Sequence, residues 1–170
     1  MGMAFLEKEP FKDIYVHALV RDEKGQKMSK SKGNVIDPLD LIEKYSADAL
    51  RFTLLSMASP GRDVKLSEDR VKGYRNFLNK IWNANNLLKQ NDCNFDEIEK
   101  PKELKVNINK WIISEYYSIN NQIKQNIKDY RFDEAARNAY QFVWHSFCDW
   151  YLELSNCLLY TSDAADEKVR

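Results

Sequence analysis

A short segment of the chain holds a cluster of cations and hydroxyls that could bind phosphate. It has no carboxylate between residues 24 and 34, and it contains four lysines and two serines: Lys24, Lys27, Lys30, Lys32, Ser29 and Ser31. Lysine ammonium groups act as movable point charges, and serine hydroxyls bind phosphate oxygens or the loop backbone. Such a loop suits a reaction in which negative charge builds up on leaving phosphates. The alternative is a solvated loop, the usual fate of a charge run.

The predicted loop is mobile, so that it can close over a triphosphate, and two of its residues bear on its conformation. Gly33 can adopt a positive φ, which allows a tight turn directly after the lysines. Met28 is the one long apolar side chain among the lysines and serines, and we expect it to anchor the loop in apolar surroundings. The sequence therefore predicts a basic loop over residues 21–34 that is held at one point.

The loop belongs to a longer pattern. The string GQKMSKSKGN and the VIDPLDLIEKYSADALRF that follows it, residues 25–52 together, resemble the signature segment of the class I aminoacyl-tRNA synthetases. The resemblance implies a parent enzyme that activates an amino acid with ATP, releases pyrophosphate and transfers the amino acid to tRNA. It implies ATP as a substrate with Mg²⁺ bound to it, and no metal held by the protein in this segment.

The same resemblance implies roles for individual residues. Lys30 is the principal phosphate-contacting lysine, Lys27 assists it, and Met28, Ser29 and Ser31 complete the ATP loop. The string ADALR at residues 47–51 resembles the helix that joins the catalytic and tRNA-binding parts. The family's HIGH sequence, the other half of its ATP site, is absent from these residues. We therefore expect the isolated chain to show no ATP–pyrophosphate exchange.

The flanking strings, not the lysine loop, bear on which amino acid is activated. Several resemble the valine-specific branch of the family, namely residues 58–63 (ASPGRD), 70–84, 109–114, 130–136 and 147–153. The implied partners are valine, tRNA(Val) and ATP, with no DNA or membrane, and the parent enzyme is expected to be a cytoplasmic monomer. The isoleucine-specific branch is the nearest alternative. A second alternative is a non-catalytic helical module that binds tRNA, and a third is a structural bundle with no RNA partner.

Several cations in and after the ASPGRD turn could contact tRNA phosphates. They are Arg62, Arg70, Lys72, Arg75 and Lys80. The alternative for each is a solvated helix face with carboxylate partners. We interpret Trp82, Trp111 and Trp150 as core residues and not as platforms for stacked bases, because each falls on or beside an apolar stripe.

The elements that must position these residues are mostly helices. Alternating apolar residues at 13–20 predict one strand, of the kind buried in a parallel sheet. Pro38 and Ser46 introduce two short helices, and Ser67 begins a long helix that runs to about Gln90. A polar connection follows at 91–105. Helices from about Asn107 and about Asp133 complete an antiparallel bundle.

The predicted fold is mainly α: one strand and loop from the end of a Rossmann-like catalytic domain, followed by an α-helical anticodon-binding bundle. We place the catalytic end at residues 1–45 and the incomplete helical domain at 46–156. Residues 157–167, CLLYTSDAADE, resemble translated sequencing-adaptor DNA, so 157–170 is expected to be a non-native tail. The alternative is a diverged helix end, in which Leu158, Leu159 and Tyr160 extend the apolar face.

Overall composition excludes some classes of protein. The 26 basic and 26 acidic residues cancel, so any RNA contact must come from local patches. Three widely spaced cysteines and two histidines predict neither a zinc site nor a disulfide framework. The sequence has no apolar run of about 18 residues, so we expect no membrane span.

Overall fold

The short helices begin at residues that cap them. The structure, a computed structural model, describes residues 2–91 and 106–157. Helix α2 (Pro38–Tyr45) starts with Asp37 Oδ1 accepting from the Leu39 amide at 2.8 Å, and α3 (Ala47–Ser56) with Ser46 Oγ accepting from the Ala49 amide at 3.3 Å. These N-caps satisfy amides that lack a helical partner. Both predicted short helices are confirmed.

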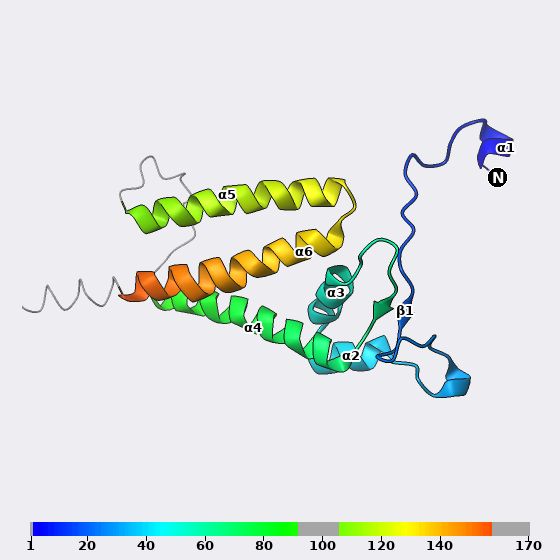
Figure 1. The fold of residues 1–170 in the computed structure, drawn as a ribbon, viewed down its shortest axis with the longest axis horizontal. Helices are drawn as coiled ribbons and strands as arrows, with labels where there is room; N and C mark the ends of the chain where they lie inside the picture. Colours follow the sequence, from blue (N-terminus) through cyan, green and yellow to red (C-terminus); the bar gives the residue numbers. More distant parts are fainter. Residues whose placement is uncertain (1, 92–105, 158–170) are drawn as a thin grey trace, which may run out of the picture.

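Three long helical segments follow the two short helices (Figure 1). Helix α4 (Glu68–Gln90) is capped by Ser67, as predicted, and ends where expected. Helix α5 (Asn107–Lys128) runs back, and α6 (Phe132–Gln141) continues into the π-helical stretch η2 (Phe142–Leu152). Helix α5 packs against α6 and η2, and η2 also packs against α4. The helical bundle is confirmed, and the predicted connection at 91–105 lies outside the described residues from 92 onward.

Two apolar clusters hold these helices. The first joins α2, α3 and the start of α4, and its buried residues are Leu41, Ala49, Leu50, Leu66 and Val71. The second joins the end of α4 to η2 through Ala84, Cys148 and Leu152. Phe52 of α3, Phe77 of α4 and Tyr140 of α6 form a chain of rings with centroids 4.7 to 5.2 Å apart. Helix α4 contributes residues to both clusters, so it connects the region of the lysine loop to the bundle.

The predicted strand at 13–20 is wrong except at its last residue. Strand β1 covers only Val20–Arg21, and it pairs in parallel with β2 (Val64–Lys65), with Val20 opposite Val64 and Arg21 opposite Lys65. Residues 13–19 belong to no strand in the described ranges, although Leu19 O accepts from the Val64 amide of β2, and Val16 is 83% exposed. β-propensity expresses a fit to neighbouring strands, so it does not make a strand where no partner is present. No residue pattern in the sequence indicates that residues 64–65 form a strand or pair with β1.

The prediction that three tryptophans lie in the core is also wrong. Trp82 is 65% exposed, Trp150 is 62% exposed and Trp111 is 40% exposed. Phe77 and Ala84 already fill the inward side of α4, so Trp82 at the edge of that stripe faces outward. In η2 the backbone hydrogen bonds run from i to i+5, so each residue turns the helix by a smaller angle than in an α-helix. Trp150, three positions after Phe147, therefore does not lie on the same packed face as Phe147.

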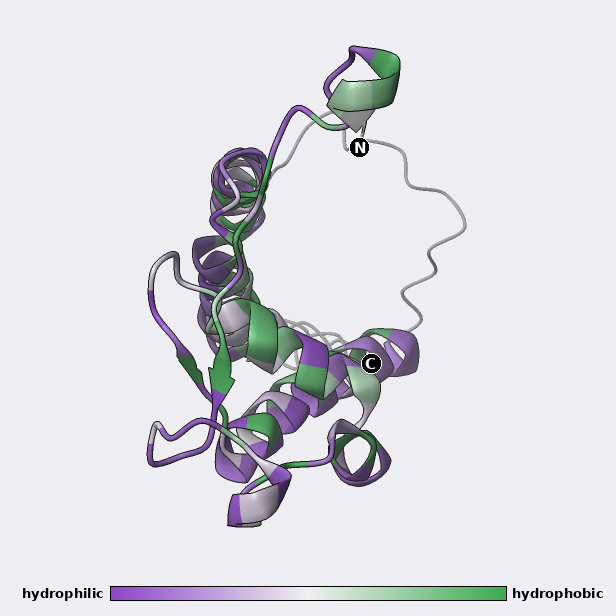
Figure 2. Ribbon diagram, turned by 90° about the vertical axis from the view of Figure 1, so that its right-hand side faces the viewer, coloured by the Kyte–Doolittle hydropathy of each residue, from purple (hydrophilic) through white to green (hydrophobic). Residues whose placement is uncertain are grey.

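The N-terminal end of the described chain stands apart from the bundle. Helix α1 (Gly2–Leu6) is separated from the other helices in both views, and Figure 2 shows hydrophobic residues on it. Phe5 is 79% exposed. Among the helices that the structure describes, none has an apolar stretch of the length that a bilayer span requires.

Candidate functional site

The lysine loop folds back on itself as a hairpin that begins at β1. Arg21 and Lys27 form an antiparallel bridge, and a turn closes at Gly25, whose amide donates to the Asp22 carbonyl at 2.9 Å. A 3₁₀ turn, η1 (Lys30–Lys32), follows, and Gly33 ends it with a φ of 65°. The positive φ expected at Gly33 is confirmed, and it reverses the chain directly after the lysines.

Met28 fixes the hairpin to the body of the protein. Its side chain is half-buried and packs against the first apolar cluster, together with Ile36. The predicted apolar anchor is therefore confirmed. Lys27 and Lys30, on either side of Met28, are exposed, so their ammonium groups remain available to a ligand. The Ser29 and Ser31 hydroxyl oxygens lie 3.2 Å apart. The structure thus brings the five predicted loop residues together on one exposed turn.

Three residues near the loop were not predicted as site residues. The side chains of Asn34 and Asp22 form hydrogen bonds with each other and with the loop backbone. Lys65 of β2 lies over Gly25, where a Cβ added to the glycine would come within 3.1 Å of Lys65 Cε. Lys65 therefore adds a cation beside the hairpin. Only the β1–β2 pairing brings it there, so a sequence reading that missed β2 could not find it.

The hairpin is tied to the following turn by an ion pair. Arg21 Nε contacts Asp63 Oδ2, and both side chains are partly exposed. The β2 backbone reinforces this contact, because the Val64 amide donates to Leu19 O at 2.9 Å and the Leu66 amide to Arg21 O at 3.0 Å. The residues before the lysine loop are therefore held to the ASPGRD turn.

The predicted tRNA-contacting cations fall into two groups. Arg62, Arg70 and Arg75 are exposed and form no ion pair with any residue that the structure describes. Half-buried Lys80 is instead held between α4 and η2, in an ion pair with Asp149 and with its ammonium 4.3 Å from the centre of the Trp144 ring. Arg70 and Arg75 are five positions apart on α4, about 140° around the helix, so they do not form one stripe.

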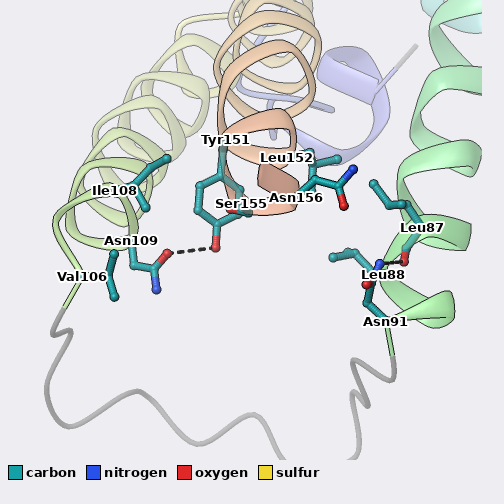
Figure 3. Close-up of a pocket in the computed structure, with 10 residues that line it drawn as sticks. All are labelled: Leu87, Leu88, Asn91, Val106, Ile108, Asn109, Tyr151, Leu152, Ser155 and Asn156. Atoms are coloured by element: carbon teal, nitrogen blue, oxygen red, sulfur yellow. Dashed lines mark hydrogen bonds between the residues drawn. The ribbon is translucent and has the colours of Figure 1, made fainter. Parts of the chain in front are cut away.

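An apolar pocket of about 340 Å³ lies at the other end of the bundle (Figure 3). The residues that line it come from the end of α4, the start of α5 and the end of η2, and they are Leu87, Leu88, Asn91, Val106, Ile108, Asn109, Tyr151, Leu152, Ser155 and Asn156. None of them is charged. The 23 residues of α4, about 34 Å of helix, separate this pocket from the lysine loop, so the two do not form one site.

The described carboxylates do not gather into a metal centre. Within residues 2–91 and 106–157, no group of three or more histidine, cysteine, aspartate or glutamate side chains is placed to hold a metal ion. The chemistry that the site can supply is positive charge and hydroxyl donors directed at an anionic ligand.

Two family models match the chain. "tRNA synthetases class I (I, L, M and V)" matches residues 1–67, and "Anticodon-binding domain of tRNA ligase" matches residues 109–170. The chain is a member of the class I aminoacyl-tRNA synthetases.

Within that family its relatives include valine–tRNA ligases. That of Pelagibacter ubique is 73% identical over 99% of this chain, and that of Mesorhizobium japonicum is 53% identical over 97%. The chain spans only 19% and 18% of the lengths of these two relatives. The chain therefore corresponds to less than a fifth of the length of such a ligase.

A solved structure shares the fold. It is the ternary complex of Agrobacterium radiobacter K84 LeuRS, tRNA and LeuAMS, which matches 79% of this chain and 18% of its own chain with a TM-score of 0.70. The sequences are 22% identical. The likeness supports the helical architecture described above.

Proposed function

We propose that this chain is part of a valine–tRNA ligase, in which it supplies the phosphate-binding loop and part of the tRNA-binding helices. The parent enzyme activates valine with ATP to valyl-adenylate and then transfers valine to tRNA(Val), in the cytoplasm. The observation that carries the proposal is the Met28-anchored hairpin, which presents Lys27 and Lys30 to solvent on a turn fixed to the core.

In the first step the valine carboxylate attacks the α-phosphorus of ATP and pyrophosphate leaves. Negative charge grows on the leaving phosphates, and the Lys30 ammonium, assisted by Lys27, stabilises it. The Ser29 and Ser31 hydroxyls donate to phosphate oxygens. Mg²⁺ arrives with the ATP. The exposed Arg62, Arg70 and Arg75 contact tRNA phosphates in the second step, and half-buried Lys80 supports that surface through its ion pair with Asp149.

The boundaries given above belong to the same proposal. Residues 1–45 end the catalytic domain, 46–156 form the helical domain, and 157–170 are a non-native tail. Residues 158–170 lie outside the described residues. Sequencing the genomic locus across codon 156 tests the tail, and continuation of the same residues in genomic DNA would overturn that assignment.

The function is tested in a chimera in which residues 1–156 replace the matching segment of the Pelagibacter ubique valine–tRNA ligase. We expect valine-dependent ATP–pyrophosphate exchange from the chimera, because the hairpin should complete the phosphate site of the host enzyme. Lys30→Ala should lower kcat by roughly 10²- to 10³-fold, the usual cost of removing a group that stabilises transition-state charge. The control is Lys89→Ala, an exposed lysine in the last turn of α4, which should change kcat less than twofold.

The isolated chain provides a second test. We expect it to catalyse no exchange, because orientation of valine against ATP requires groups that these residues do not supply. Robust valine-dependent exchange by the purified 170 residues would contradict this account of the chain. Loss of valine-dependent exchange in the chimera would contradict the proposed function.

A further inference from the structure

Asn34 lies outside the five-residue lysine motif, yet its side chain contacts three parts of the hairpin. Its Oδ1 accepts from the Ser29 amide at 2.9 Å. Its Nδ2 donates to the Lys27 carbonyl at 3.2 Å and to Asp22 Oδ2 at 2.9 Å. One half-buried amide therefore binds the backbone on both sides of Met28 and a carboxylate at the start of the hairpin.

Only a carboxamide satisfies these three partners. The Ser29 amide needs an acceptor, while the Lys27 carbonyl and the Asp22 carboxylate each need a donor. An aspartate at this position would offer acceptors only, and an alanine would leave all three partners without the side chain. The partners also fix which end of the amide is oxygen, because the reverse orientation would place an N–H group against the Ser29 N–H.

Asp22 holds the other end of this arrangement. Its Oδ1 accepts from the Gln26 amide at 2.6 Å, which closes the turn of the hairpin. The hydrogen bond from Asn34, followed by that from the Gln26 backbone, lowers the pKa of Asp22 below 3.8. The other charged residues that line the same hollow are Glu23, Lys24 and Lys32, and Arg21 beside it is paired with Asp63. The Asp22 carboxylate is therefore a charged acceptor at neutral pH.

We propose that Asn34 is a positioning residue for the phosphate loop: it fixes the backbone of Lys27 and Ser29, and Asp22 orients its amide. This inference depends on the proposed function. A loop whose backbone is already fixed needs less ordering in the transition state, so its lysine and serine side chains start close to the phosphates. Without the amide, the same side chains remain but lie on a looser turn.

The test uses the chimera and reads kcat for valine-dependent exchange against the KM for ATP. Asn34→Ala should lower kcat by about 10- to 100-fold, with a smaller change in KM for ATP and none in KM for valine. Asn34→Asp should be at least as damaging at neutral pH, because the new carboxylate faces that of Asp22. Two adjacent carboxylates share a proton, and the pKa of one rises.

The pH profile separates positioning from a general loss of structure. As the pH falls through that raised pKa, the protonated carboxyl becomes a donor, so the activity of Asn34→Asp relative to the parent should rise. The double variant Asn34→Asp, Asp22→Asn reverses donor and acceptor between the two positions. It should exceed Asn34→Asp in activity at neutral pH and lose the pH-dependent recovery. Single variants within twofold of the parent, or a double variant no better than Asn34→Asp, would overturn the proposal.

A measurement on the 170-residue chain keeps this proposal separate from the proposed function. Amide hydrogen exchange at Ser29, and the carboxyl titration of Asp22 by NMR, report on the hydrogen bonds without any catalysis. Asn34→Ala should speed exchange at Ser29 and raise the pKa of Asp22 towards 3.8. If neither changes, the positioning role fails even in an active enzyme. The other outcome is that hydrogen exchange at Ser29 and the pKa of Asp22 both change, while the chimera without substitutions shows no ATP–pyrophosphate exchange. In that case the hydrogen bonds of Asn34 are supported and the proposed function fails.

Discussion

The Ser59 hydroxyl donates a hydrogen bond to Asp133 Oδ2 at 2.8 Å, joining the ASPGRD turn to the first turn of α6 across 74 positions of the chain. Asp133 also accepts from Arg131 Nε at 3.2 Å, and its side chain is only 11% exposed. Burial raises the pKa of Asp133, but the hydrogen bonds from Arg131 and Ser59 outweigh it and lower the pKa below 3.8. The carboxylate is thus charged at neutral pH and links two helical regions.

The lowered pKa predicts how this link depends on pH. A carboxyl whose folded pKa is lowered contributes stability that is present above its unfolded pKa and is lost as the pH falls through the folded value. Asp133→Asn should therefore lower the free energy of unfolding at neutral pH by about 1 kcal/mol. The difference from the parent should shrink below about pH 4. Urea unfolding at several pH values measures it, and a difference that is constant down to the acid limit would contradict the prediction.

Ser59→Ala tests the other partner of this hydrogen bond. It should cost about 0.5–1.5 kcal/mol of the free energy of unfolding, since the Asp133 carboxylate keeps its contacts with Arg131. In a double-mutant cycle with Asp133→Asn, the two effects should be non-additive. Ser114→Ala, on the exposed side of α5, is the matched control and should change stability by less than about 0.5 kcal/mol.

Lys80 should contribute mainly to the stability of the chain, and Arg75 mainly to tRNA binding. The hydrogen bond from Lys80 is the main cause that lowers the pKa of Asp149, and Lys80 also lies over Trp144. Solvent screens this ion pair, because the Asp149 side chain is 39% exposed, so Lys80→Ala should destabilise the chain by only about 0.5–1 kcal/mol, whereas exposed Arg75→Ala should have little effect on stability. In filter binding of tRNA at two salt concentrations, Arg75→Ala should weaken binding and reduce the salt dependence. Equal stability losses in both variants would contradict this division.

Two glycines provide opposite predictions for one substitution. Gly73 lies within α4 with no heavy atom within 4 Å of an added Cβ, so Gly73→Ala should stabilise the chain by about 0.5–1 kcal/mol. Gly33 has equal space but a φ of 65°, so Gly33→Ala should destabilise the hairpin by about 1–2 kcal/mol. Thermal unfolding measures the first, and hydrogen exchange at Ser29 measures the second. Stabilisation by both substitutions would show that φ at Gly33 imposes no cost.

The helices were predictable because their signals are local. Asp37, Ser46 and Ser67 each cap a helix from within three residues of the amide they bind, and the same side-chain chemistry appears in the sequence. The failed strand at 13–20 had the right residue types, but a strand also needs a partner, which no local pattern specifies. The exposure of Trp82 and Trp150 likewise depends on which helix faces are covered.

The same distinction applies to the candidate site. The pentapeptide Lys27 to Ser31 was predicted because it is contiguous, and the apolar contacts of Met28 follow from its residue type. Asn34 and Asp22 are 12 positions apart, and nothing in the sequence says that their side chains bond. Lys65 reaches the hairpin only through the β1–β2 pairing. Contacts between positions far apart in sequence are therefore the part of the site that needed the structure.

A last prediction concerns how the extended segment before β1 meets the bundle. The Tyr15 ring stacks on Tyr130, with centroids 5.9 Å apart, and meets Phe132 edge-on at 5.5 Å. The negative charge of Asp13 is the main cause that raises the pKa of Tyr130 above 10.0. Burial also raises this pKa, but the larger part of the shift requires residues 13–15 to lie against the α5–α6 turn, so the Tyr130 phenol reports on that contact.

Asp13→Asn should therefore bring the pKa of Tyr130 down towards 10.0, as followed by NMR titration of the phenol. Tyr15→Ala should do the same if the stacked ring is what keeps Asp13 in place. Asp129→Asn is the matched control, because Asp129 lies on the same turn but bonds Gln125 and does not contribute to the shift. An unchanged Tyr130 pKa in Asp13→Asn would mean that the segment does not pack on the turn in solution. The sign is diagnostic, since loss of a neighbouring negative charge can only make the phenol easier to ionise.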